Sequence, residues 1–220
     1  MKITIEWNYK PAKSSHTIRF VSDSLSLKEA IRTALDIERT GRLGTIMFID
    51  ENGTYWSKKE LQKLAAEKET EPMNVVCYFD GGYKKDDGKS GQGAVIYYEQ
   101  NEKRYRYRVN ASLEQIDSNN ESEYAALWLL VNELEQLGVH HSTVTIKGDS
   151  MVVIHQMTGE WPCYEQELQR WMDKIEAKLK KLGLTPIFEL IPRNENKKAD
   201  FLATQALSNI SIEAKKEMID

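Results

Sequence analysis

The spacing of apolar residues divides this chain into segments with the period of strands and segments with the period of helices. Residues 3–7 alternate apolar and polar side chains, which predicts a half-buried strand. Residues 123–134 instead place apolar side chains three and four positions apart, which predicts an amphipathic helix. A charged segment that ends in proline, residues 66–72, interrupts these patterns and indicates a linker. We therefore expect two domains, residues 1–70 and residues 73–220.

The first domain shows the order strand, strand, helix, strand, strand, helix, which is typical of a small α+β domain. Ser24 and Ser26 are alternative caps for its first helix. Ser57 and Glu60 are spaced as a capping box at the start of the second helix. The Asn52-Gly53 pair lies between two short apolar runs, where it predicts a hairpin.

The second domain begins with three strand-like runs joined by short loops, which favours an antiparallel meander. Helices and strands then alternate, so we expect an α/β domain with a mixed sheet and helices on its faces. The expected strands are residues 75–79, 94–98, 104–109, 143–147 and 187–191, and the expected helices are residues 120–137, 150–157, 164–182 and 197–207.

Composition narrows the class of protein. Apolar residues make up 40% and charged residues 29% of the chain, which is ordinary for a globular protein. The formal net charge of −4 excludes a global positive field, so binding to a nucleic acid would need a local basic face, backbone donors or metal ions. We expect neither a signal peptide nor a membrane span, because no apolar run is long enough. Cys77 and Cys163 lack zinc-ligand spacing, which indicates reduced thiols in a cytoplasmic protein. We also expect the protein to be a monomer.

Four acidic residues lie at positions where an isolated carboxylate is costly. Asp80 interrupts an apolar strand, Glu123 opens the apolar face of a helix, Asp149 ends a strand and Asp200 lies early in the last helix. The three aspartates each have a plain alternative: Asp80 as a turn residue, Asp149 as a helix cap and Asp200 as an exposed helical residue. Taken together, oxygen ligands with no Cys or His among them suit Mg²⁺, or Mn²⁺, and predict a metal site.

Helical periodicity separates Glu123 from its neighbour Glu121. Ser118 is spaced to form a capping box with Glu121, which gives Glu121 a structural role. Glu123 shares a face with Leu127 and Leu134, at offsets of four and eleven residues, and that face must cover the sheet. We therefore assign the metal-binding role to Glu123.

Four short motifs surround these acids. They are Phe79-Asp80-Gly81-Gly82, Asn119-Asn120-x-x-Glu123-Tyr124-x-Ala126-Leu127, Gly148-Asp149-Ser150 and Pro192-Arg193-x-x-Asn196-Lys197-x-Ala199-Asp200. In this order, across residues 74–207, they resemble the type 1 ribonuclease H family. The resemblance implies a five-stranded mixed sheet that carries the acidic quartet, and it implies cleavage of the RNA strand of RNA–DNA hybrids.

The resemblance also implies a mechanism and a set of roles. Two Mg²⁺ ions about 4 Å apart would bridge the scissile phosphate, giving 5′-phosphate and 3′-hydroxyl ends. Asp80 would bind both ions, Asp200 would complete the site that activates water, and Glu123 and Asp149 would hold the ion at the leaving group. These four acids are thus both the catalytic and the metal-binding residues that the sequence predicts.

Substrate contacts are implied as well. Gly81, Gly82 and Asn119 match positions that in the family touch the RNA backbone and its 2′-hydroxyls, which distinguish RNA from DNA. The implied partner is an RNA–DNA hybrid, and the sequence identifies neither a membrane nor a protein partner. Two alternatives stay open: a noncatalytic nucleic-acid-binding protein with the same fold, or a metal nuclease that acts on another nucleic acid. The quartet argues against the first, because carboxylates beside a polyanion are costly without metal.

The chain departs from the family pattern in two places. Many members carry a histidine in the loop before the last aspartate, whereas residues 191–196 contain none; Arg193 and Glu195 are candidate substitutes. The first domain does not match the hybrid-binding domain of some ribonucleases H. It weakly resembles the N-terminal extension of ribonuclease-H-like proteins of spore-forming bacteria. Its Trp7 and Trp56 are either core residues or base-stacking platforms, and we favour the core.

Overall fold

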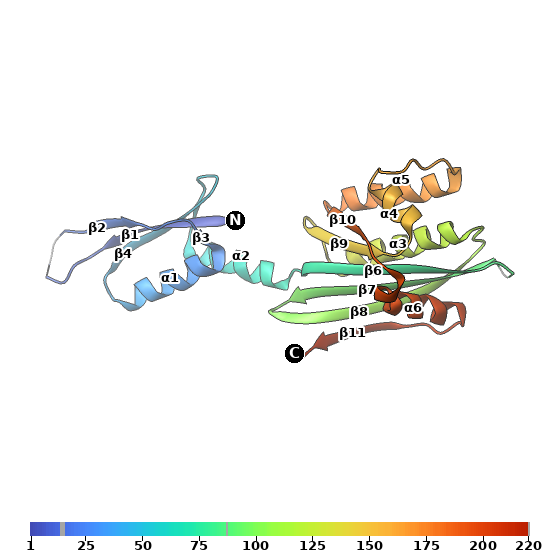
Figure 1. Cartoon of the computed structure of the whole chain (residues 1–220). Coiled ribbons are helices and arrows are strands. Elements are labelled where there is room, and N and C mark those ends of the chain that lie inside the picture. The colour runs from blue at the N-terminus through green and yellow to red at the C-terminus, as the bar shows by residue number, and fades with distance from the viewer. Residues whose placement is uncertain (14–15, 87, 220) are drawn as a thin grey trace. The chain divides into compact units, whose positions relative to one another are not determined.

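The computed structural model describes residues 1–13, 16–86 and 88–219 (Figure 1). Its strands and helices follow the expected order, with two additional strands at residues 25–26 and 213–218. The chain divides into two compact units, Met1–Thr70 and Glu71–Asp220. The buried apolar residues of the first unit form one cluster and those of the second form another, with no residue in common. Each unit therefore has a hydrophobic core of its own.

The first unit is an antiparallel sheet in the order β2-β1-β4-β5, with β3 paired to β1. Ile3 and Ile5 of β1 are fully buried, together with Ala30 and Ala34 of α1. The alternation read from residues 3–7 thus becomes the face of the sheet that packs on α1. The elements are β1 (Lys2–Tyr9), β2 (Ile18–Val21), β3 (Leu25–Ser26), α1 (Leu27–Arg39), β4 (Leu43–Asp50), β5 (Tyr55–Trp56) and α2 (Lys58–Thr70).

Local sequence signals in this unit are confirmed. Ser26, not Ser24, caps α1: its Oγ accepts the Glu29 N–H at 3.3 Å, and the Glu29 carboxylate accepts the Ser26 N–H at 2.9 Å. Ser57 and Glu60 form the same reciprocal pair at α2, with distances of 3.2 and 2.8 Å. These boxes satisfy backbone donors that a helix start would leave unpaired.

Both tryptophans of the first unit pack against its core. Trp7 is half-buried and stacks on Phe20, with ring centroids 5.4 Å apart. Trp56 is also half-buried, and its Nε1–H donates to Asp50 Oδ2 at 2.9 Å. The core interpretation of these side chains is therefore confirmed.

The second unit is built on a mixed sheet that, within the described residues, has six strands in the order β10-β9-β6-β7-β8-β11. β6, β7 and β8 form the expected antiparallel meander, while β9 runs parallel to β6 and β10 parallel to β9. The strands are β6 (Met73–Lys84), β7 (Lys89–Gln100), β8 (Lys103–Glu114), β9 (Thr143–Gly148), β10 (Thr185–Leu190) and β11 (Glu213–Met218).

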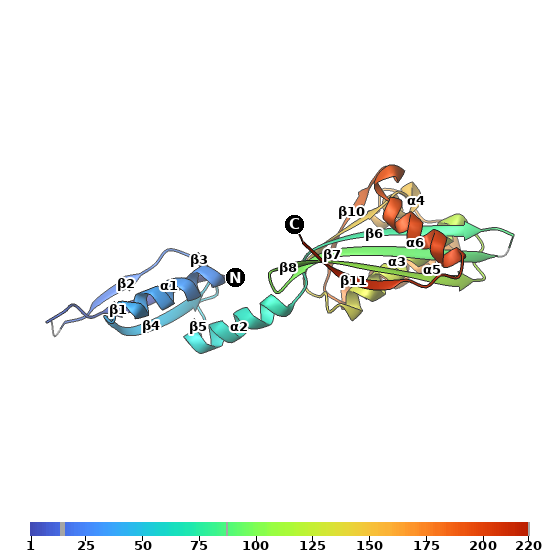
Figure 2. The ribbon, with the colours of Figure 1, turned by 90° about the horizontal axis from the view of Figure 1, so that it is seen from below.

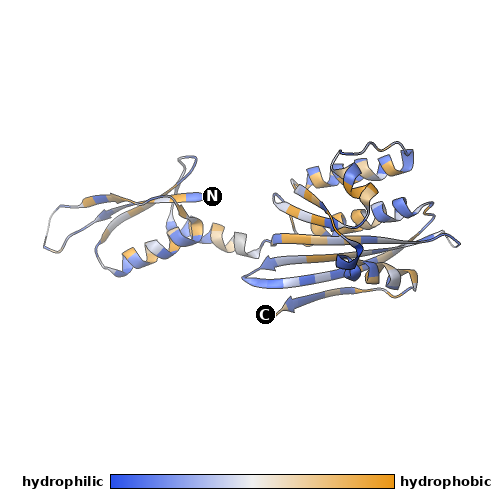
Figure 3. Cartoon of the chain, in the orientation of Figure 1, coloured by the Kyte–Doolittle hydropathy of each residue, from blue (hydrophilic) through white to orange (hydrophobic). Residues whose placement is uncertain are grey.

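Helices cover the two faces of this sheet unequally. In Figures 1 and 2, α3 and α5 lie on one face and α6 on the other. Phe79 and Leu127 are fully buried in the core between the sheet and α3. Figure 3 shows hydrophobic residues concentrated along β6 and α3, whereas β11 is mostly hydrophilic. The helices are α3 (Asn119–Gln136), α4 (Met151–Met157), α5 (Gln166–Lys181) and α6 (Lys197–Leu207).

The expectation of five strands is wrong, because β11 adds a sixth at the edge beside β8. Its sequence, Glu-Ala-Lys-Lys-Glu-Met, lacks the apolar alternation that marks a half-buried strand. Long-range contacts hold the segment instead: the Asn110 side chain donates to Ile210 O at 2.9 Å and accepts the Ile212 N–H at 2.7 Å. Such contacts are decided by the fold, so periodicity could not predict this strand.

No helix within the described residues is both long and apolar enough to cross a membrane. Cys77 is buried and Cys163 is half-buried, and both are free thiols. Burial raises the pKa of each thiol, which disfavours the reactive thiolate.

Two glutamates meet one tyrosine where β11 joins the unit. The Tyr107 hydroxyl lies 3.0 Å from Glu133 Oε2 on α3 and 3.1 Å from Glu213 Oε1 on β11. Burial, and secondarily the charge of Glu213, raises the pKa of Glu133, although the hydrogen bond with Tyr107 opposes that shift. Folding therefore favours the protonated form of Glu133.

The variant Glu133→Gln is expected to unfold at a higher temperature than the wild type at pH 8. A raised pKa in the folded state gives a stabilising contribution that is complete below about pH 4 and is lost as pH rises through that pKa. Glutamine cannot ionise and can still accept from Tyr107, so the difference should vanish toward pH 4. Thermal unfolding followed by circular dichroism between pH 4 and 8 measures it.

The matched control is Glu135→Gln on the same helix. Hydrogen bonds from Lys178 and Lys181 lower the pKa of Glu135, so this carboxylate contributes stability above its ordinary pKa and loses it in acid. Its substitution should therefore not stabilise the protein at pH 8. Equal pH profiles for the two variants would contradict the role assigned to the buried Glu133.

Candidate active site

Asp80 lies in the middle of the sheet on β6. It pairs with Gly93 of β7 and is only 5% exposed. β6 continues through Gly81 and Gly82 to Lys84, so the interpretation of Asp-Gly-Gly as a turn is wrong. A carboxylate at this position is held on a rigid strand and is largely removed from water.

Glu123 reaches Asp80's strand from the first turns of α3. A Cβ on Gly81 would lie 2.3 Å from Ser122 O, so only glycine lets the strand and the helix approach this closely. At this contact the Gly81 N–H donates to Glu123 Oε2 at 3.1 Å. The side chain of Glu123 therefore points at β6, as its helical register predicts.

Glu121 lies on another side of α3. Ser118 Oγ accepts the Glu121 N–H at 3.1 Å, which is half of the expected capping box. The returning bond goes one residue further, from Asp117 N–H to Glu121 Oε2 at 2.8 Å, and the Trp171 indole donates to Oε1 at 3.1 Å. Both carboxylate oxygens of Glu121 thus accept structural hydrogen bonds.

Asp149 follows the last residue of β9. The interpretation of Asp149 as a helix cap is wrong, because Ser150 is the N-cap of α4 and its Oγ accepts the Val153 N–H at 3.4 Å. Asp149 Oδ1 instead lies 2.5 Å from Asn196 Nδ2, and Asp149 Oδ2 lies 3.7 Å from Arg193 Nε. Its side chain is 11% exposed, so it is mostly covered and faces Asn196 and Arg193.

Asn196 belongs to the fourth motif, and the structure places it within the site. It is 1% exposed, and its Nδ2 donates to Phe79 O at 2.9 Å and lies 3.5 Å from Asp80 Oδ1, in addition to its bond with Asp149. Its backbone carbonyl accepts the Asp200 N–H at 3.2 Å, which begins α6. Asn196 therefore joins Asp80, Asp149 and the helix of Asp200. Its spacing of four residues before Asp200 was the signal available in the sequence.

Electrostatics couple the four acids. Burial, followed by the charges of Asp149 and Asp200, raises the pKa of Asp80 to about 7. Burial, followed by the charges of Asp80 and Asp149, raises the pKa of Glu123, while the Gly81 N–H and Arg193 oppose this shift. The neighbouring charges thus make ionisation of Asp80 and of Glu123 costly, and a cation would offset that cost.

The donor set fits a hard divalent cation, because it consists of carboxylate oxygens. In the described part of the chain, no three His, Cys, Asp or Glu side chains form a group that could hold a metal ion as they stand. The Asn196 amide lies against oxygens of two of these carboxylates, Asp80 and Asp149, and so helps to fix their orientation.

A groove opens beside the acids. Its volume is about 660 Å³, and Glu123, Asp149, Asn119 and Arg193 are among the residues that line it. The Arg193 side chain is 84% exposed, and its guanidinium lies near Asp149. Glu195 does not line this groove but a different hollow. Of the two candidate substitutes for the loop histidine, the structure brings only Arg193 to the acids.

The candidate RNA contacts differ in what they can offer. The Gly81 N–H is taken by Glu123, and the Gly82 carbonyl accepts from Ser122 Oγ at 3.0 Å. Both glycines therefore have packing roles. Asn119 is exposed at the start of α3 and lines the groove, so its amide is open to a ligand.

Known proteins with similar sequences indicate the family of this chain. Residues 78–206 match the family described as reverse transcriptase-like, and they contain all four acids. The chain belongs to this family. The uncharacterized protein YpeP of Bacillus subtilis (strain 168) is 42% identical over 204 residues, which cover 92% of this chain and 90% of that protein. That similarity spans both units.

Ribonucleases H are among the similar proteins. Ribonuclease HI of Halobacterium salinarum is 30% identical over 93 residues, which cover 42% of this chain and 45% of that protein. The crystal structure of RNase H1 from the same organism superposes with a TM-score of 0.53 and 25% identity, covering 61% of this chain and 98% of that one. LC11-RNase H1 in complex with an RNA/DNA hybrid gives a TM-score of 0.55 and 25% identity over 62% of this chain and 98% of that one. The second unit thus has the ribonuclease H fold.

Proposed function

We propose that this protein is an endonuclease that cleaves the RNA strand of RNA–DNA hybrids and leaves 5′-phosphate and 3′-hydroxyl ends. One observation carries the proposal: the charges of Asp149 and Asp200 act on the buried Asp80, those of Asp80 and Asp149 act on the buried Glu123, and Glu123 and Asp149 line an open groove. The ribonuclease H structures that share this fold, one of them bound to a hybrid, support the choice of substrate.

Asp80, Glu123, Asp149 and Asp200 would hold Mg²⁺, with Mn²⁺ as a possible replacement. When bound, the metal would lower the pKa of the attacking water and stabilise the leaving 3′-oxygen. The chain itself orients the ligands: the Gly81 N–H holds Glu123, and Asn196 and Arg193 hold Asp149. Fixed partners of this kind keep ligating carboxylates in place.

Discrimination of RNA from DNA would involve Asn119. Its side-chain amide can donate to and accept from a 2′-hydroxyl, which DNA lacks. Gly81 and Gly82 would act through close packing, since Gly81 lies against the start of α3 and Gly82 against α6.

The test is incubation of the purified chain with labelled RNA–DNA hybrid, duplex RNA and duplex DNA, each with Mg²⁺, Mn²⁺ or EDTA. We expect cleavage of the RNA in the hybrid with either metal and none with EDTA. Cleavage of duplex RNA or DNA instead would identify a metal nuclease with another substrate. Metal-dependent binding without cleavage of any substrate would reject an enzymatic role.

The catalytic unit is expected to fold without the first unit. A chain of residues 73–220 retains all four acids and the entire second core. If residues 1–70 bind the substrate, their removal should raise KM more than it lowers kcat, which is the signature of lost uniform binding. The rise in KM should shrink as salt increases if those contacts are to phosphates.

Circular dichroism and hybrid-cleavage kinetics of the truncated and full-length chains measure both parts of this prediction. An unfolded fragment would show that the two units depend on each other for stability. Equal KM and kcat values would exclude a role for residues 1–70 in binding this substrate.

A further inference from the structure

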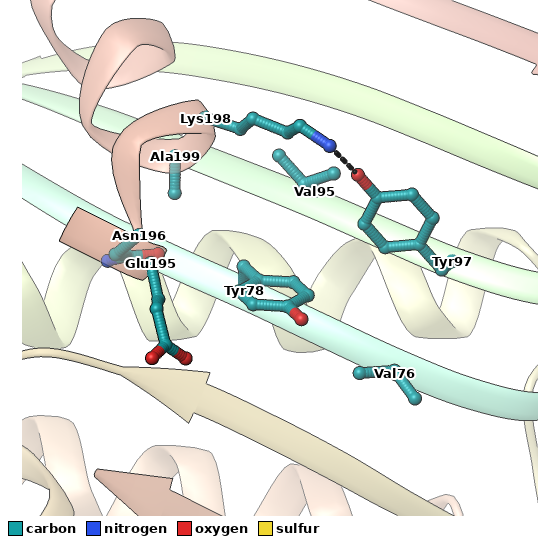
Figure 4. A pocket seen from close by; sticks show the side chains of 8 residues that line it. All are labelled: Val76, Tyr78, Val95, Tyr97, Glu195, Asn196, Lys198 and Ala199. Carbon is teal, nitrogen blue, oxygen red and sulfur yellow. Dashed lines mark hydrogen bonds between the residues drawn. The ribbon is translucent and has the colours of Figure 1, made fainter. Parts of the chain in front are cut away.

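A second hollow lies on the face of the sheet that α6 only partly covers. It measures about 410 Å³. Tyr78 and Tyr97 meet edge to face in its floor, with ring centroids 5.9 Å apart and an interplanar angle of 81°. Lys198 of α6 extends over it and donates to the Tyr97 hydroxyl at 2.7 Å (Figure 4). The hollow therefore presents two aromatic rings and the Lys198 cation to a ligand, and the carboxylate of Glu195 also lines it.

Unpaired cations continue this face beyond the hollow. The register pairs Tyr97 with Arg106 and Val95 with Arg108, so both arginines share the face of Tyr97. Lys216 of β11 lies opposite Arg106. Among the described residues, Arg106, Arg108 and Lys216 make no ion pair with an acid, and the buried Nε of Arg106 has no hydrogen-bond partner.

This arrangement is unfavourable in the isolated protein. Like charges directly opposite each other on neighbouring strands repel, and a buried donor without an acceptor loses its hydration without compensation. Glu99 and Glu189 on the same face already have partners: Glu99 is 3.5 Å from Arg104, and Glu189 is 2.7 Å from Lys147. Glu195 lines the hollow itself, at the end of the face away from β8 and β11. An anionic ligand would supply what Arg106, Arg108 and Lys216 lack.

We propose that this face binds a single strand of nucleic acid outside the catalytic groove. A base would lie against Tyr97 and Tyr78, and phosphates of the strand would contact Arg106, Arg108 and Lys216. Aromatic platforms beside a line of cations are how proteins hold single strands without reading their sequence. A duplex would not fit as well, because its bases are stacked inside and cannot enter the hollow.

The test is binding of a fluorescein-labelled twenty-nucleotide oligothymidylate to the full-length chain in EDTA, followed by fluorescence anisotropy. Arg106→Gln combined with Arg108→Gln should weaken binding by about tenfold or more at about 50 mM salt. The slope of log affinity against log salt should fall by roughly 1.4, about 0.7 for each lost phosphate contact. Tyr97→Leu should weaken binding by about tenfold with little change in the slope.

The charge-matched control is Lys103→Gln combined with Lys215→Gln. Lys103 lies on β8 and Lys215 on β11, as do the proposed phosphate contacts, but both lysines are on the opposite face of the sheet. There Lys215 covers Tyr105, with its Nζ 4.3 Å from the ring centroid. The control should bind the oligonucleotide within about twofold of the wild type. Circular dichroism establishes that each variant is folded.

Two results would overturn the proposal: an arginine double variant that binds no worse than the control, or thymidine monophosphate that competes as well as the oligonucleotide. The second would mean that the hollow takes a free nucleotide. Cleavage of a blunt-ended hybrid is measured separately. Its absence in the wild type would reject the proposed nuclease function without changing this binding result.

Discussion

Asp149→Asn is expected to abolish cleavage of RNA–DNA hybrid while the protein stays folded. The substitution removes one negative ligand, and a loss of several kcal/mol of transition-state stabilisation corresponds to a fall in kcat of about 10³-fold or more. Asparagine keeps an oxygen that can accept from Asn196, so the local packing should survive. Steady-state kinetics with labelled hybrid measure the loss.

Two controls accompany this variant. Asp173→Asn makes the same chemical change at an exposed position of α5 and should leave kcat unaltered. Thermal unfolding with and without Mg²⁺ should show that the metal stabilises the wild type more than Asp149→Asn, because binding to the folded state alone raises stability. A folded Asp149→Asn protein with full activity would refute the role of this acid.

The second large effect is expected at Glu123 and not at Glu121. Glu123→Gln keeps an acceptor for the Gly81 N–H but loses the charge that a metal needs, so kcat should fall by about 10³-fold. Glu121→Gln should retain most of the activity. It replaces one of the two oxygens that accept from Asp117 and Trp171, so we expect a loss of about 1 kcal/mol in the free energy of unfolding.

Kinetics and thermal unfolding of both variants separate catalysis from stability. The pair is closely matched, because the same change is made two residues apart on one helix. If Glu121→Gln were inactive and Glu123→Gln active, the catalytic assignment on α3 would have to be reversed.

Local sequence signals accounted for most of the secondary structure. The two capping boxes of the first unit formed because a serine and a glutamate three residues apart can satisfy each other's backbone donors without help from the rest of the fold. The orientation of Glu123 followed from helical periodicity, since its face had to meet the sheet. Capping boxes and helical periodicity involve residues of a single helix, so the sequence of that helix is enough to predict them.

The interpretation of Asp80 as a turn residue and that of Asp149 as a helix cap were wrong because contacts outside these short segments were decisive. Asp-Gly-Gly is a sequence that favours turns. β6 nevertheless continues through it, because Gly81 pairs with Gln92 of β7 and Gly82 pairs with Gly91. Ser150 caps α4 in place of Asp149, which leaves the aspartate free to face Asn196. A distant strand thus decided the state of Asp80, whereas the neighbouring Ser150 and the distant Asn196 together decided that of Asp149.

The sequence by itself determined the order of elements, the positions of the four acids on them and the family to which they point, because periodicity and short motifs are local properties of the chain. Only the tertiary structure decided that Asn196 lies between Asp80 and Asp149, that β11 pairs with β8 at the edge of the sheet, and that Arg106 and Arg108 have no acidic partner among the described residues. These features depend on which distant segments pack together. Backbone pairing, burial and long-range charge set that packing, and none of them is encoded in the spacing of neighbouring residues.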